Sequence, residues 1–297
     1  TYQIDTFLLE VIMSFFVTKI DDEFSKISLK EYLTINCLSI DKIKYLFNNK
    51  CCYVNGHLVT EDYLLNINDS LCIDTSFYDE IDYIPTEYKL DILYEDDYLL
   101  IVNKPAKCII YDANQNDTMA NYIAYHYMIN DLSYKVRHVH RLDYDTSGCL
   151  VYAKDIITHA CLNKMIEDGT FKRYYLAIVE NRLAKKEGII DLAIGKDRHI
   201  NGKMIVSKTG KKAITHYKVI KETTKYSVVS LKLDTGRTHQ IRVHMATIKN
   251  PLLGDSLYGS KVSKDRVLLH SHIVEFIHPI NKNKISIECP KPEDMNM

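Results

Sequence analysis

The sequence predicts an α+β protein with two parts: a small α+β unit over residues 1–76 and a larger domain over residues 90–297. We expect the larger domain to contain a mixed, largely antiparallel sheet flanked by helices. Two observations favour this fold class. In the larger domain the predicted strands outnumber the predicted helices, and several consecutive strands are joined by short turns. A doubly wound parallel sheet would instead alternate strand and helix along the chain, so we do not expect one.

The first unit is predicted from apolar spacing and turn residues. Ser28 and Ser39 lie where N-cap residues belong, each ahead of a run whose apolar residues recur at a spacing near 3.6. Asn55 and Gly56 separate two β-prone runs and predict a tight hairpin. The elements expected in this unit are a strand at 12–20, helices at 28–35 and 40–47, a hairpin over 51–59 and a strand at 71–74.

The larger domain follows a linker at residues 77–89, where the composition shifts toward Asp, Glu and Tyr and where Pro85 interrupts regular structure. Thr118 ends an Asn-Asp-Thr sequence that matches a glycosylation acceptor, but we expect it to cap a helix. The strands expected in this domain are 90–94, 98–103, 149–154, 173–180, 213–220, 226–233 and 266–276, and the helices are 118–129, 156–168 and 238–248.

The composition limits the class of protein. The chain has 297 residues, 46% of them hydrophobic, which is enough for a packed core, and its net charge of −1 gives no overall attraction for nucleic acid. A function on RNA must therefore depend on local clusters. The 8 cysteines are scattered without a CxxC pair, so we expect a reducing compartment and a cytoplasmic protein. The apolar stretch at 7–17 is too short to cross a bilayer, and no membrane association is expected.

The densest polar cluster spans residues 138–148, His-Val-His-Arg-Leu-Asp-Tyr-Asp-Thr-Ser-Gly, directly before a predicted strand. One interpretation is a solvated turn in which Asp145 and Ser147 bond to the local backbone. Another is a metal site, because His138 and His140 alternate as ligands on a strand do. No third ligand at a suitable spacing accompanies them, so we expect no metal.

A second cluster spans residues 233–244, Leu-Asp-Thr-Gly-Arg-Thr-His-Gln-Ile-Arg-Val-His. The turn at Gly236 is expected to open a helix with Thr238 near its N-terminus. On such a helix Thr238, His239 and Arg242 can share a face, since residues three and four apart are neighbours. An ordinary basic helix face is the alternative interpretation.

A third cluster lies at residues 171–179, Phe-Lys-Arg-Tyr-Tyr-Leu-Ala-Ile-Val, and predicts a strand. Alternate residues of a strand face the same side, so Arg173 and Tyr175 should point the same way. Taken alone, this cluster is a weak signal because Tyr is common in the chain.

Taken in order, these clusters resemble the RluA family of pseudouridine synthases. The match runs from about residue 90 to about residue 280. Each motif is moderately specific alone, and four in the right order leave little room for chance. The motifs that carry the resemblance are Tyr94-Glu95-Asp96-Asp97-Tyr98-Leu99-Leu100-Ile101-Val102-Asn103-Lys104-Pro105, His140-Arg141-Leu142-Asp143 with Thr146-Ser147-Gly148, Gly210-Lys211-Lys212-Ala213-Ile214-Thr215, and Gly236-Arg237-Thr238-His239-Gln240-Ile241-Arg242-Val243-His244 followed by Pro251, Gly254-Asp255 and Tyr258-Gly259.

The resemblance implies an enzyme that isomerises uridine in structured RNA to pseudouridine. It makes Asp143 the catalytic carboxylate beside C1′, acting either by attack or as a base toward the C2′ proton. It implies that Tyr175 takes the C5 proton. It also implies that Asp143 is buried and forms an ion pair with Arg242, which keeps the carboxylate ionised. It also implies that Arg141 fills the place of the extruded uridine in the stack. The residues expected to contact RNA are Arg141, His140, Thr146, Arg237, His239, Gln240, Lys42 and Lys44.

No cofactor is implied, because the reaction exchanges one bond for another within a single substrate. The sequence also lacks G-x-x-x-x-G-K-[S/T] and G-x-G-x-x-G motifs, so no nucleotide cofactor is expected. We expect a monomer that acts on large-subunit ribosomal RNA. A transfer-RNA pseudouridine synthase, a catalytically inactive RNA-binding protein and a hydrolase of N-glycosidic bonds remain alternatives.

Residues 27–75 more faintly resemble the S4 RNA-binding domain that precedes the catalytic domain in many family members. On its second helix this chain has Lys42, Lys44 and Lys50 where members often carry Arg. Lys contacts phosphate as a point charge and lacks the bidentate fork of Arg. The chain also has Lys107 where the family usually has Gly, and it lacks the His-Pro that usually follows.

Overall fold

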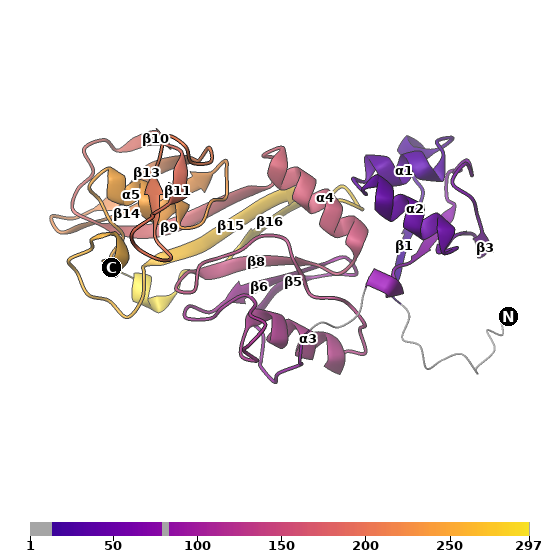
Figure 1. The fold of residues 1–297 in the computed structure, drawn as a ribbon, viewed down its shortest axis with the longest axis horizontal. Helices are drawn as coiled ribbons and strands as arrows, with labels where there is room; N and C mark the ends of the chain where they lie inside the picture. Colours follow the sequence, from indigo (N-terminus) through magenta and orange to yellow (C-terminus); the bar gives the residue numbers. More distant parts are fainter. Residues whose placement is uncertain (1–13, 79–82, 297) are drawn as a thin grey trace.

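The computed structural model describes residues 14–78 and 83–296, and places a small N-terminal unit at one end of a long sheet (Figure 1). The unit contains a four-stranded sheet in the order β1-β4-β2-β3 and two short helices. Its elements are β1 (Phe15–Lys19), α1 (Leu29–Ile35), α2 (Ile40–Asn48), β2 (Cys52–Val54), β3 (His57–Leu58) and β4 (Ser70–Asp74). The predicted elements are all present, although residues 12 and 13 of the first expected strand lie outside the described residues.

Local chemistry explains the shape of this unit. The Ser28 hydroxyl accepts a hydrogen bond from the Glu31 amide and so caps α1, whereas Ser39 precedes α2 without a side-chain cap. Asn55 and Gly56 both have positive φ, 51° and 81°, which is the geometry of a tight hairpin turn whose twist matches the flanking strands.

The larger sheet runs in the order β10-β13-β14-β9-β15-β8-β6-β5, with β16 paired to β15 and β7 to β8. Among the described residues every pairing in this sheet is antiparallel except that of β8 with β15, so the predicted mixed, largely antiparallel sheet is confirmed. Its strands are β5 (Ile92–Glu95), β6 (Leu99–Lys104), β7 (Arg137–His138), β8 (Ser147–Ala153), β9 (Lys172–Glu180), β10 (Glu187–Asp191), β13 (Ile214–Glu222), β14 (Tyr226–Leu233), β15 (Leu269–Ile277) and β16 (Lys284–Glu288).

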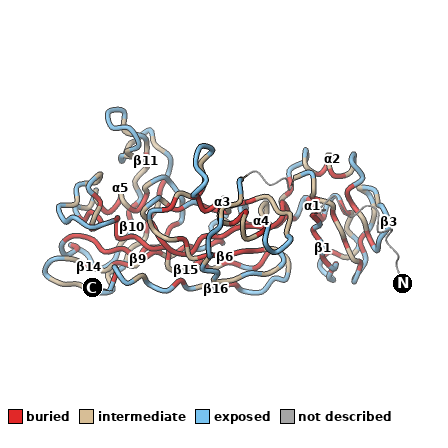
Figure 2. The backbone as a smooth tube through the Cα atoms, turned by 90° about the horizontal axis from the view of Figure 1, so that it is seen from below, coloured by how far each residue is buried: buried red, intermediate tan, exposed pale blue. Residues whose placement is uncertain are grey.

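Five strands were not predicted: β7, β10 and β16 of this sheet, and the separate hairpin of β11 (Ile194–Lys196) with β12 (Met204–Val206). They are short, and β10 buries only Ile190 among its five residues. Segments of two to five residues are too short to show a clear apolar period, on which a sequence-based prediction depends. The buried positions concentrate instead in the central strands (Figure 2).

Three helices pack on the two faces of the sheet: α3 (Met119–Ile129), α4 (Ile156–Glu167) and α5 (Gln240–Thr247). Alternate residues of β6 face opposite sides, and Leu100 lies in the core cluster that contains α3 and α5 residues, whereas Leu99 lies in the cluster that contains Leu162 of α4. Thr118 caps α3 through a capping box with Asn121, as predicted.

The N-terminal unit packs against α4. Ile156, Ile157 and Cys161 of this helix join the core cluster of the N-terminal unit, and Leu162 joins the core of the large sheet. The Cys161 thiol also lies 3.3 Å from the Asn36 carbonyl oxygen. Helix α4 therefore contributes side chains to the core of the N-terminal unit and to the core of the large sheet. Among residues 14–78 and 83–296, no helix has the length and apolar character needed to cross a bilayer.

Candidate active site

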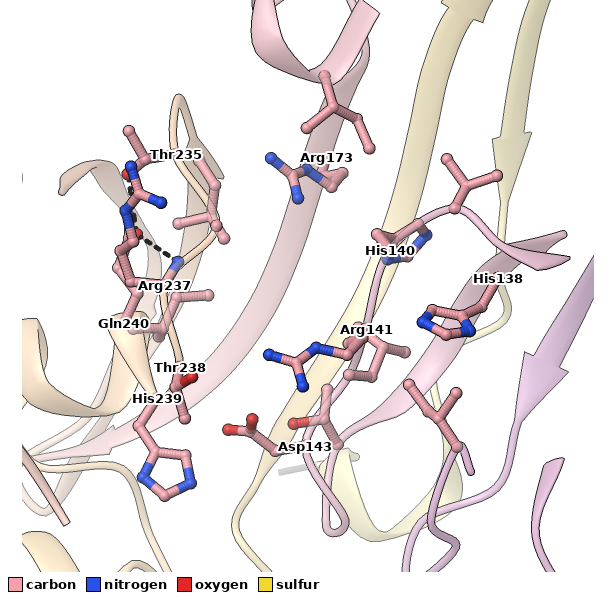
Figure 3. Close-up of a pocket in the computed structure, with 18 of the residues that line it drawn as sticks. His138, His140, Arg141, Asp143, Arg173, Thr235, Arg237, Thr238, His239 and Gln240 are labelled. Atoms are coloured by element: carbon pink, nitrogen blue, oxygen red, sulfur yellow. Dashed lines mark hydrogen bonds between the residues drawn. The ribbon is translucent and has the colours of Figure 1, made fainter. Parts of the chain in front are cut away.

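A cleft of about 900 Å³ opens where the loop before β8, the start of β9 and the loop before α5 meet. Figure 3 shows the side chains of these three segments pointing toward one another across it. Asp143, Tyr175 and Arg242 all line this cleft, although they are separated in the sequence by up to about 100 residues. Apolar side chains that belong to the main core, Leu142, Leu233, Ile241 and Leu269, also line it.

Arg242 links two carboxylates in the cleft. Its Nη1 lies 3.6 Å from Oδ2 of Asp143, a loose ion pair. Its Nε and Nη2 donate hydrogen bonds of 2.7 and 2.9 Å to the two oxygens of Asp255, whose side chain is fully buried. The Tyr258 ring lies 5.0 Å from the guanidinium carbon and adds a cation–π contact. Asp255 therefore fixes the guanidinium, and one edge is left to face Asp143.

The Asp143 carboxylate is more open to solvent than expected. Its side chain is 27% exposed, while that of Arg242 is 11% exposed. The role that the resemblance implies for Asp143, beside C1′ of a bound nucleotide, needs this access. The buried ion pair predicted for Asp143 with Arg242 is instead the pair of Arg242 with Asp255.

Lys104 holds the loop that carries Asp143. Its ammonium group is buried and donates hydrogen bonds to the carbonyl oxygens of Pro105, Tyr144 and Thr146, at 2.8, 3.2 and 2.9 Å. Burial lowers the pKa of Lys104 to about 8, although Cys108, Asp143 and Asp145 oppose that shift. The loop closes on itself through the Thr146 amide, which donates to the Asp143 carbonyl oxygen at 3.0 Å.

Tyr175 and Arg173 lie two residues apart on β9, and both line the cleft, as the alternation of the strand predicts. Tyr175 is only 5% exposed. Burial raises the pKa of its phenol above the ordinary value, Arg173 opposes the shift and Asp143 adds to it. At neutral pH the phenol is therefore protonated in the free protein.

The loop before α5 is held in place by Gln240. Its side-chain oxygen accepts hydrogen bonds from the Thr235 hydroxyl and the Arg237 amide, at 2.8 and 3.0 Å (Figure 3). Its side-chain nitrogen donates to the Ile214 carbonyl oxygen and the Thr215 hydroxyl, at 2.9 and 3.0 Å. Gln240 was expected to contact RNA, but in the structure its amide bonds to protein groups and positions the loop.

Helix α5 begins at Gln240, two residues later than predicted, because His239 adopts a left-handed conformation with φ of 55°. Thr238 and His239 therefore cannot share a helix face with Arg242, and that prediction is wrong. All three nevertheless line the cleft. The Nδ1 of His239 lies 2.9 Å from the Tyr258 hydroxyl. This contact connects the loop to Tyr258, whose ring packs against Arg242.

The other residues expected to contact RNA fall into two groups. Arg141 and Arg237 are exposed on the rim of the cleft, whereas His140 and Thr146 line it but are buried. Lys42 and Lys44 lie apart from the cleft, on α2 of the N-terminal unit. Burial, together with the nearby Arg137, lowers the pKa of Lys42.

The interpretation of residues 138–148 as a solvated local turn does not fit. The Ser147 hydroxyl lies 2.9 Å from Nδ1 of His270, and Asp145 accepts a hydrogen bond from the Val267 amide at 3.3 Å. Both partners are more than 100 residues away, so the interpretation as local turn bonding is wrong. In the part of the chain that the structure describes, no group of three His, Cys, Asp or Glu could hold a metal ion.

Sequence reasoning missed the supporting roles of Lys104, Asp255 and Tyr258. Signals for two of them were present. Lys104 has the strand spacing of the buried Leu100 and Val102, and Asp255 follows the apolar sequence Pro-Leu-Leu-Gly. A charged residue in a buried pattern indicates a satisfied partner nearby.

Comparison with known proteins agrees with this geometry. Residues 98–247 match the family described as RNA pseudouridylate synthase. The chain is 46% identical over 248 residues to an uncharacterized RNA pseudouridine synthase, YhcT, of Bacillus subtilis, with 82% of each chain covered. It is 32% identical over 297 residues to the ribosomal large subunit pseudouridine synthase D of Vibrio cholerae, covering 94% of this chain and 87% of that protein.

The fold agrees as well. The structure of human RNA pseudouridylate synthase domain containing 1 superposes with a TM-score of 0.59 at 24% identity, covering 70% of this chain and 86% of that one. The chain therefore belongs to the RluA family of RNA pseudouridine synthases, and it is an isomerase with the pseudouridine synthase fold.

Proposed function

We propose that this enzyme converts uridine to pseudouridine in large-subunit ribosomal RNA, with Asp143 as its catalytic carboxylate. The observation that supports this most is the meeting of Asp143, Tyr175 and Arg242 in one cleft, from three segments far apart in the sequence. A carboxylate, a phenol and a fixed guanidinium are the groups that the reaction needs.

In the proposed mechanism the N1–C1′ bond of the target uridine breaks with the Asp143 carboxylate beside C1′. Positive charge develops at C1′, as in glycoside cleavage, and a carboxylate stabilises it either by attack or by removing the C2′ proton. Arg242 orients Asp143, and Asp255 holds Arg242 in place. The freed uracil then turns and joins C1′ through C5.

The last step restores the aromatic ring by removing the proton from C5, while N1 ends the reaction bearing a hydrogen. Tyr175 is proposed to accept the C5 proton. Because burial raises its pKa, the phenol must give up its own proton as it does so, and Asp143 is a neighbouring carboxylate that can take it. This proton, passed on directly or exchanged through solvent, balances the one that N1 gains, so Asp143 ends as a carboxylate again.

The target uridine must leave its helix to reach the cleft. We propose that Arg141, exposed at the rim with its guanidinium directed across the cleft, occupies the vacated space (Figure 3). His140, Thr146, Arg237, His239 and Gln240 surround the bound nucleotide or position the loops that do.

The proposal of large-subunit ribosomal RNA depends on the relatives. Proteins named ribosomal large subunit pseudouridine synthase D in Xylella fastidiosa, Zymomonas mobilis and Vibrio cholerae are 32 to 35% identical to this chain. We further propose that residues 1–76 form a separate S4-like RNA-binding domain, joined by a linker at 77–89 to the catalytic domain at 90–297. In it Lys42 and Lys44 would contact phosphates.

The test is release of tritium from C5-labelled transcripts of large-subunit ribosomal RNA and of transfer RNA, with the purified enzyme and no added cofactor. The proposal expects release from the ribosomal transcript alone. Release only from transfer RNA would contradict the substrate class. Binding without release would favour a catalytically inactive RNA-binding protein, and free uracil among the products would favour a hydrolase.

A further inference from the structure

Arg173 is a buried cation without a partner among the described residues. Its side chain lines the cleft and only 5% of the residue is exposed. Within residues 14–78 and 83–296, no side chain or carbonyl oxygen accepts a hydrogen bond from its guanidinium, and no carboxylate pairs with it. A guanidinium keeps its charge at any physiological pH.

Other buried or largely buried arginines of this domain do have protein partners. Arg242 forms two hydrogen bonds with Asp255, and Arg266 forms two with Asp294. Arg137 donates to the Lys154 carbonyl oxygen. Because an unpaired buried charge destabilises a fold, a charge kept in this state indicates an anion that binds later.

His140 is a second buried polar residue in this cleft, and the charge of Arg173 acts on it. It is 6% exposed, lines the same cleft, and neither of its ring nitrogens has a hydrogen-bond partner in the described chain. Burial, together with the charge of Arg173, lowers the pKa of His140 to about 3. A neutral imidazole offers one N–H donor, so Arg173 and His140 form a pair of unsatisfied donors on one wall.

The loop that carries Gly236 lies close to this guanidinium. A Cβ atom on Gly236 would lie 3.0 Å from Nη1 of Arg173, so glycine allows the loop to pass close to the guanidinium. In Figure 3 the Arg173 guanidinium points into the space between this loop and the segment that carries His140 and Arg141.

We propose that Arg173 and His140 bind a phosphodiester group of the RNA backbone next to the target uridine. The inference rests on the proposed action of this cleft on RNA. The planar guanidinium matches two phosphate oxygens, and the imidazole N–H adds a third bond. Since alternate residues of a strand are about 7 Å apart, the phosphate would lie within about one nucleotide of the group at Tyr175.

The experiment compares Arg173→Met with Lys172→Met. Lys172 is the exposed neighbour on the same strand, so its variant loses the same charge on the opposite side of β9. Binding of decauridylate is measured over a range of KCl concentrations, and thermal unfolding is measured without RNA. Tritium release by the unsubstituted enzyme is measured in parallel, because it tests the proposed function independently.

We expect Arg173→Met to weaken binding about 10- to 100-fold and to reduce the slope of log affinity against log salt by about 0.7, which is the value for one phosphate of a single strand. Its melting temperature should be unchanged or higher, because an unpaired charge has been removed. Lys172→Met should change affinity less than twofold. Arg173→Lys should keep the salt slope but lose part of the affinity, since the charge remains and the fork does not.

Three results would overturn the proposal. Unchanged affinity and slope in Arg173→Met would show that no phosphate binds there, even if the unsubstituted enzyme converts uridine normally. Weaker binding with an unchanged slope would indicate a neutral part of the nucleotide as ligand. A lower melting temperature in both Arg173→Met and Arg173→Lys, without a change of slope, would make Arg173 a structural residue.

Discussion

Two largely buried arginines line the cleft from different elements, and they differ in their partners. Arg242 on α5 is held by the buried Asp255 and the Tyr258 ring, and approaches Asp143 at 3.6 Å. Arg173 on β9 has no partner among the described residues. A paired arginine can be part of a rigid site before substrate arrives, whereas an unpaired one gains its partner with the substrate. Arg242 is thus the group proposed to orient the catalytic carboxylate, and Arg173 is the group proposed to bind RNA.

Removing the paired arginine should have the largest effect. Arg242→Met leaves Asp255 buried and unpaired, so we expect a loss of about 3–5 kcal/mol in the free energy of unfolding and a fall of kcat by about 100-fold or more. Urea unfolding and tritium release measure the two effects. If stability were unchanged, as expected for Arg173→Met, the contrast between the two arginines would be wrong.

Changing Asp255 instead of Arg242 tests whether the position of the Arg242 guanidinium matters for catalysis. Asp255→Asn keeps the size of the side chain but removes its charge, and Arg242 is then free to pair more closely with Asp143. We expect a loss of about 2–3 kcal/mol in stability and a fall of kcat by about 10- to 100-fold, with KM nearly unchanged. A KM effect with kcat intact would mean that Asp255 serves RNA binding.

Tyr175 lies on β9 with Arg173, and its hydroxyl should affect kcat but neither RNA binding nor stability. Tyr175→Phe removes only the hydroxyl, so we expect kcat to fall about 100-fold or more, while decauridylate binding and the melting temperature change little. Full turnover in this variant, measured by pseudouridine content rather than tritium release, would make Tyr175 a packing residue.

The last effect, which should be the smallest on catalysis at neutral pH, concerns the stability of the protein in acid. Burial lowers the pKa of His140 to about 3 and that of His159 to about 4. Below pH 6.5 the unfolded chain takes up protons that the folded chain does not, so stability present above pH 6.5 is lost as the pH falls toward 4. The loss should be at most about 1.4 kcal/mol per pH unit for each histidine. Urea unfolding at pH 7 and pH 5 measures it, and His159→Asn should reduce the pH dependence. An equal slope in that variant would contradict the account.

Much of the fold could be predicted because it depends on local patterns. The capped helices, the Asn55-Gly56 hairpin and the apolar central strands all follow from residue spacing. The five missed strands could not, because each has only two to five residues, too few for a clear apolar period. Lys107 shows a finer case: it stands where the family usually has Gly, and it adopts a positive φ of 58°, the conformation that favours glycine.

The residues of the site could be predicted from the sequence, but the hydrogen bonds and ion pairs that connect them could not. Motif order pointed to Asp143, Tyr175 and Arg242, and the three do line one cleft. The sequence could not show that Arg242 bonds mainly to Asp255, nor that Gln240 holds a loop through four hydrogen bonds. Partner choice among buried polar groups is decided by packing in three dimensions, and spacing alone does not reveal it.

The central claim is that Asp143 carries the chemistry of this cleft, and Asp143→Asn tests it most directly. The measurement is tritium release from C5-labelled large-subunit ribosomal RNA, together with binding of the same RNA. We predict a loss of turnover of about 10⁴-fold or more, with binding within a few-fold of the unsubstituted enzyme. Continued conversion of uridine by purified Asp143→Asn would contradict the claim.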